Sequence, residues 1–108
     1  MELPWPPKEL SPNARKHWRA CASIRKKYKE ECWILAKSQR PNLVTDHLEV
    51  TFHPPDGRKR DLDNMLASCK SLLDAVSLAV GRDDSHWALT IRKGEPLRPL
   101  GCVVVKFV

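Results

Sequence analysis

Hydrophobic and polar residues alternate along two segments of the chain, and this alternation is the pattern of a half-buried β-strand. Leu48, Val50 and Phe52 alternate with polar neighbours and predict a strand that ends near His53. The segment from Trp87 to Ile91 alternates in the same way and predicts a second strand.

Two further strands are predicted near the ends of the chain. Glu2 to Trp5 is a short extended segment closed by Pro6-Pro7, which is typical of an edge strand, and we expect Trp5 to be anchored in the core. Cys102 to Val108 is a nearly continuous apolar run. Such a run indicates a central strand or a strand at an interface.

Apolar residues at helical spacing predict two helices. The first runs from about Ala14 to Ser38, and its apolar stripe consists of Ala14, Trp18, Cys21, Tyr28, Cys32 and Leu35. The second has Asp63 at or near its N-cap and Gly81 at its end. Its apolar side consists of Leu66, Cys69, Leu72, Leu73, Val76 and Val80.

The predicted elements follow one another in the order β-α-β-α-β-β over 108 residues, which is the size of one domain. We therefore expect a single domain, residues 1–108, of the α/β (α+β) class, with a small mixed sheet and two helices packed on it. The apolar runs all fall short of the roughly 18 residues that span a bilayer, and the four cysteines form no C-x-x-C pair. We expect a protein of the reducing cytoplasm, without a membrane segment.

The net charge of the chain indicates the class of its binding partner. The chain has 19 Lys and Arg against 13 Asp and Glu, a formal net charge of +6, which favours a polyanionic partner. Seven cations precede the first acid of the first helix: Arg15, Lys16, Arg19, Arg25, Lys26, Lys27 and Lys29. A solvated helical face is the usual interpretation of a charge run; the absence of local acids here favours contact with phosphates.

The segment before the second helix contains the residues that could bind a metal ion. A Pro54-Pro55-Asp56-Gly57 turn leads into three consecutive cations, and Asp61 and Asp63 follow. One such Asp is explained as a helix cap. Two carboxylates beside cations also suit a Mg²⁺ ion that acts on a polyanion. On a continuous helix, Lys70 would lie within about 20° of Asp63.

The order of these segments resembles the RusA-like endodeoxyribonucleases, which resolve four-way (Holliday) DNA junctions and are common in phages and prophages. The resemblance spans nearly the whole chain. It rests on Leu3-Pro4-Trp5-Pro6-Pro7, Arg60-Asp61-Leu62-Asp63-Asn64, the stretch from Lys70 to Asp74-Ala75, and Asp83-Asp84 before Trp87.

The resemblance implies that Asp61, Asp63 and Asp84 bind Mg²⁺ or Mn²⁺ and that Lys70 assists catalysis. One position departs from the family pattern. Members of the family often have the assisting lysine three residues after the Asn, where this chain has Ala67. Lys70 lies about one helical turn further on, on the same predicted face.

The sequence therefore predicts a Mg²⁺-dependent endodeoxyribonuclease, a homodimer that resolves four-way junctions by paired symmetric incisions during DNA recombination and repair. A non-catalytic basic DNA-binding protein is the alternative, because the basic segments alone suffice for binding. A small basic protein that binds an acidic protein partner is a third hypothesis. The expected DNA contacts are Arg15, Lys16, Arg19, Lys26, Lys27, Arg58, Lys59, Arg60 and Lys93.

Overall fold

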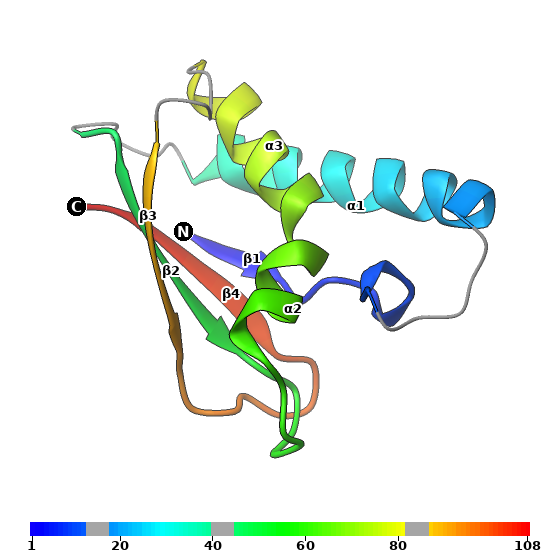
Figure 1. The fold of residues 1–108 in the computed structure, drawn as a ribbon. Helices are drawn as coiled ribbons and strands as arrows, with labels where there is room; N and C mark the ends of the chain where they lie inside the picture. The colour runs from blue at the N-terminus through cyan, green and yellow to red at the C-terminus, as the bar shows by residue number, and fades with distance from the viewer. Residues whose placement is uncertain (13–17, 40–44, 82–86) are drawn as a thin grey trace.

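The computed structural model describes residues 1–12, 18–39, 45–81 and 87–108. In chain order, the described residues form β1 (Glu2–Pro4), a 3₁₀ turn η1 (Lys8–Leu10), α1 (Trp18–Ser38), β2 (His47–His53), α2 (Leu62–Ser68), α3 (Lys70–Val80), β3 (Ala88–Lys93) and β4 (Cys102–Phe107). Figure 1 shows the helices gathered on one side of the sheet. The predicted mixed α/β class is confirmed, and no described helix has the length and apolar character needed to cross a membrane.

The four strands form one mixed sheet in the order β1-β4-β2-β3. β4 lies antiparallel between β1 and β2, whereas β2 and β3 run parallel. This central position of β4 confirms the first of the two alternatives that its apolar run indicated. Val103 and Val105 are buried on the helix-facing side, and Val104 is half-buried on the other.

The core lies between the sheet and the helices. Leu48, Val50 and Phe52 of β2 are fully buried there, as the alternation predicted. Trp5 is half-buried and packs its ring edge-on against Phe52, with 6.4 Å between the ring centroids. The anchoring role predicted for Trp5 is therefore confirmed.

The buried stripe of α1 differs from the predicted one at its C-terminal end. Cys21, Tyr28 and Cys32 are buried as expected, but the next buried residue is Ala36, whereas Leu35 is 36% exposed. The buried positions Cys21, Tyr28, Cys32 and Ala36 are separated by seven, four and four residues, which is the spacing of one helical face. Leu35 lies off this face and is turned toward solvent. The predicted start of this helix, at Ala14, lies outside the described residues.

The second predicted helix is divided in two at Cys69, so the expected two-helix count is wrong. The N–H of Cys69 donates to the carbonyl of Leu66, three residues back, and its φ and ψ are −100° and 12°. One residue earlier, the Ser68 hydroxyl donates to the carbonyl of Asn64 over 2.9 Å. A hydroxyl that bonds to the carbonyl four residues back bends a helix, and this accounts for a break at this point.

Candidate metal and nucleic-acid site

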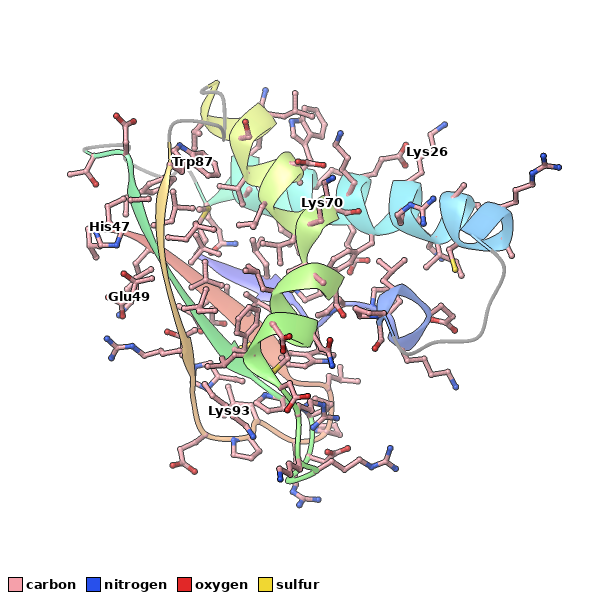
Figure 2. The ribbon with its side chains drawn as sticks, in the orientation of Figure 1. Lys26, His47, Glu49, Lys70, Trp87 and Lys93 are labelled. Carbon is pink, nitrogen blue, oxygen red and sulfur yellow. The ribbon has the colours of Figure 1, made fainter. Side chains whose placement is uncertain are left out.

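The carboxyl ends of the parallel strands meet the start of α2 at one end of the sheet. β2 ends at His53, and the turn that follows leads directly to Asp61, the N-cap of α2. β3 ends at Lys93, which pairs with Phe52 and therefore lies on the same, helix-facing side of the sheet. Because α2 contacts β3, this register places Lys93 near the beginning of α2 (Figure 2).

Asp61 and Asp63 are exposed at the beginning of α2. The backbone carbonyl of Asp61 accepts the first helical hydrogen bond, from Met65 N over 3.1 Å, but the Asp61 side chain forms no cap hydrogen bond. Oδ1 of Asp63, in the first turn, accepts a hydrogen bond from Asn64 N over 3.0 Å. Capping therefore leaves most of the oxygen atoms of this pair available, and carboxylate oxygens are the ligands that Mg²⁺ prefers.

The third proposed metal ligand, Asp84, lies outside the described residues, as do the proposed DNA contacts Arg15 and Lys16. Within the ranges that the structure describes, no group of three or more His, Cys, Asp or Glu side chains forms a metal site. His53, which ends β2, has its Nδ1 within 2.8 Å of the Glu95 carbonyl. Of the three metal ligands that the resemblance implies, the structure therefore describes Asp61 and Asp63.

The three cations before the pair have different surroundings. Arg58 and Lys59 are exposed, which suits contact with DNA. Arg60 is partly buried: its Nη1 donates to Oδ1 of Asp56 over 2.8 Å, and its guanidinium lies 5.7 Å from the centre of the Trp5 ring. The hydrogen bond from Arg60, more than any other cause, lowers the pKa of Asp56. Arg60 therefore braces the turn, a role that the sequence analysis missed.

The loop between β3 and β4 supports the same turn from the other side. Leu97 N donates to the Pro54 carbonyl over 2.8 Å, and Gly94 N donates to the Phe52 carbonyl over 2.8 Å. Gly101 adopts a left-handed conformation with φ of 71°, and a Cβ at this position would lie 2.7 Å from Pro55 N. The backbone that leads into Asp61 is thus held by Arg60 and by this loop.

Lys70 lies at the start of α3, beyond the break at Cys69, so the single continuous helix that related it to Asp63 is not formed. It lines a pocket between α1 and α3 together with Ala67 and Asp74. Neither Asp61 nor Asp63 lines this pocket. The structure therefore brings Lys70 together with Ala67, the position where the RusA-like family often has its lysine, and places both beyond the carboxylate pair.

The basic first helix contributes to the same pocket, but only through some of its cations. Arg25, Lys26 and Lys29 line the pocket, whereas Arg19 and Lys27 are exposed on α1 outside it. The charge run alone did not separate these residues. The signal that does separate them is helical spacing, since residues 25 and 26 lie four and three positions before residue 29 and share its face.

The fold and this site define a small mixed α/β protein with an exposed carboxylate pair at a helix start and a cationic pocket beside it. No protein-family model matches the chain. The chain is 32% identical over 111 residues to an uncharacterized protein of Xylella fastidiosa (strain Temecula1), an alignment that covers 97% of this chain and 72% of the relative. It belongs to the same family as that protein, whose name states no function.

Proposed function

We propose that this protein is a Mg²⁺-dependent endodeoxyribonuclease that resolves four-way DNA junctions. The observation that carries the proposal is the exposed Asp61–Asp63 pair, which begins α2 beside the end of β3 and keeps most of its carboxylate oxygens free of cap hydrogen bonds. The preference for a junction over other DNA is supported by the sequence resemblance to the RusA-like enzymes.

In this proposal Asp61, Asp63 and Asp84 hold the metal ion. A bound Mg²⁺ supplies Lewis acidity and lowers the pKa of water for attack on phosphorus. The rigid turn braced by Arg60 fixes the direction of the carboxylates, so that the ion and the scissile phosphate meet in one geometry. Exposed Arg58 and Lys59 contact the DNA backbone ahead of the pair.

Lys93 and Lys70 have different places in the fold, and we assign them different roles. Lys93 is placed by its pairing with Phe52 at the strand end where α2 begins, and we assign to it the neutralisation of charge on the scissile phosphate. Lys70, the lysine implied by the family resemblance, lies further along in the pocket, where it contacts a neighbouring phosphate.

The proposal includes a homodimer. A four-way junction has two-fold symmetry, and each chain carries one Asp61-Asp63-Asp84 set, so two symmetric incisions require two chains related by the same symmetry. The central position of β4 accounts for its apolar run without an interface. The symmetry of the substrate is therefore the argument for the dimer, which light scattering would detect at twice the 12.4 kDa chain mass.

A non-catalytic DNA-binding protein is the second candidate, and one observation favours it: four cations line a pocket that contains neither Asp61 nor Asp63. Synthetic four-way junctions incubated with and without Mg²⁺, beside linear duplex, distinguish the two. A nuclease cuts the junction only when Mg²⁺ is added. Salt-dependent binding with no cleavage at any Mg²⁺ concentration would contradict the nuclease and support the binding protein.

A further inference from the structure

A pocket of about 590 Å³ opens between η1, the first half of α1 and the junction of α2 and α3. Four cationic side chains line it: Arg25, Lys26 and Lys29 from α1 and Lys70 from α3. Figure 2 shows Lys26 and Lys70 on these two adjoining helices. Two acids, Glu9 and Asp74, also reach the pocket, so its lining carries a positive balance.

The three lysines of this pocket, Lys26, Lys29 and Lys70, are available to a ligand. In the part of the chain that the structure describes, Lys26, Lys29 and Lys70 form no ion pair with Glu9 or Asp74 within 4.0 Å. The remaining polar lining consists of the hydroxyl residues Ser11, Ser68 and Ser71. Ammonium and guanidinium groups match the oxygens of a phosphate. The volume far exceeds that of a metal ion and accommodates a phosphate with its attached sugar.

The pocket begins close to the carboxylate pair. Asp63 and Ala67 are four residues apart within α2, so they share one face of that helix, and Ala67 lines the pocket. Lys70 begins α3 after the break at Cys69 and lines the same pocket.

We propose that the α1–α3 pocket binds one backbone phosphate of the cleaved DNA strand, away from the scissile bond. The inference rests on the proposed nuclease function, since the carboxylate pair defines where the strand is cut. The α1 cations then have different roles. Arg25, Lys26 and Lys29 hold this phosphate, whereas Lys27, one residue away from Lys26, does not.

The test uses the full chain and a fluorescent four-way junction in EDTA, where cleavage cannot occur. The variant Lys26→Gln/Lys29→Gln removes two charges from the pocket. The control Lys37→Gln/Lys106→Gln removes two charges from exposed positions outside it, on α1 and on β4. The pocket variant should make the slope of log affinity against log salt shallower by about 0.9, the value for one phosphate contact, and the control should not.

A neutral methylphosphonate, placed at one position of the strand at a time, locates the phosphate. One position should weaken binding of the wild-type protein and have no effect on the pocket variant. Equal slope changes in the pocket and control variants, or the absence of any such position, would overturn the inference. Cleavage in Mg²⁺ is measured separately: a wild-type protein that binds but never cuts contradicts the proposed nuclease, whereas normal cutting with an unchanged slope contradicts only the pocket.

Discussion

The guanidinium of Arg60 donates a hydrogen bond to Oδ1 of Asp56 over 2.8 Å and so closes the turn between β2 and α2. The same nitrogen lies 3.3 Å from the Asp56 carbonyl oxygen. The Arg60 side chain is 22% exposed, against 83% for Arg58, two residues earlier. Asp61 follows Arg60 directly in the chain, so we expect a change in this contact to reach the backbone that carries the carboxylates.

We expect Arg60→Lys to lower both stability and activity. Lysine keeps the charge but loses the planar fork that bonds to Asp56 and lies over Trp5. The loss of this partly exposed, charge-assisted hydrogen bond should lower the free energy of unfolding by a small but measurable amount. Cleavage of the junction should fall further than this loss explains, because Asp61 is displaced.

The matched control is Arg58→Ala, at the exposed end of the same turn. It should weaken binding to DNA while leaving the melting temperature unchanged, since its contact with Asp56 is 3.8 Å long and open to solvent. Thermal melts and cleavage rates of both variants test whether Arg60 braces the turn. Wild-type values for Arg60→Lys in both measurements would show that the brace has no role.

Sequence reasoning succeeded where one periodicity decides the outcome. The alternation of Leu48, Val50 and Phe52 determined the buried face of β2, and the apolar run of β4 indicated a central or an interface strand, of which the structure shows the first. Sequence reasoning failed where a single local hydrogen bond determines the conformation of the backbone. The break at Cys69 depends on how the Ser68 hydroxyl is used, and the role of Arg60 depends on a turn that brings it back to Asp56. Neither contact has a sequence signal beyond its residue types.

The sequence predicted the pair of carboxylates of the candidate site but not the positions of the cations around it. Lys93 was expected as a DNA contact, but the sequence did not predict its position. The parallel register places it beside Phe52, on the side that α2 covers. Lys26 and Lys27 are equivalent in a charge run; helical spacing groups Lys26 with Lys29, and the packing of α1 against α3 shows that this face lines the pocket.

Asp63→Asn tests the carboxylate pair. Asparagine keeps an oxygen that accepts the hydrogen bond from Asn64 N, so the helix start and the melting temperature should be preserved. The charge that binds the metal is lost, and cleavage should fall by at least about 10²-fold with little change in junction affinity. Glu95→Gln, an equal charge change at an exposed loop position, is the control. Retained cleavage would restrict Asp63 to a structural role.

The two lysines are separated by steady-state kinetics. Lys93→Ala should lower kcat by about 10²-fold, because it removes a fixed charge from the scissile phosphate. Lys70→Ala should mainly raise KM, because it removes a contact with a phosphate that is bound equally in the ground and transition states. The reverse pattern would return the assisting role to Lys70.

Gly101→Ala should destabilise the turn beneath Asp61. The φ of 71° disfavours any residue with a Cβ, and this Cβ would meet the backbone at Pro55 N and at the His53 carbonyl, 2.7 and 2.8 Å away. We expect a loss of about 1–3 kcal/mol in the free energy of unfolding, measured in urea. Gly57→Ala is the control, since a Cβ there meets nothing within 4 Å. Equal stability of the two variants would contradict the assigned backbone constraint.

The last prediction concerns the buried thiols between α1 and the α2–α3 junction. Burial raises the pKa of Cys32 and of Cys69 from 9.0 to about 12, and it raises the pKa of neighbouring Tyr28 as well. Between pH 9 and pH 12, therefore, the folded protein keeps protons that the unfolded chain loses. The stability contributed by these protons is complete below pH 9 and decreases as the pH rises toward 12, by up to about 1.4 kcal/mol per pH unit for each thiol.

Urea denaturation at about pH 8 and about pH 10.5, on either side of the ordinary thiol pKa, measures this loss. Cys32→Ala starts from a lower stability, because it leaves a small cavity, but it removes one of the two titrating thiols. Its free energy of unfolding should therefore fall less between the two pH values than that of the wild-type protein. An equal fall in both proteins would mean that the Cys32 thiol is not held protonated by the fold and that the alkaline loss arises elsewhere.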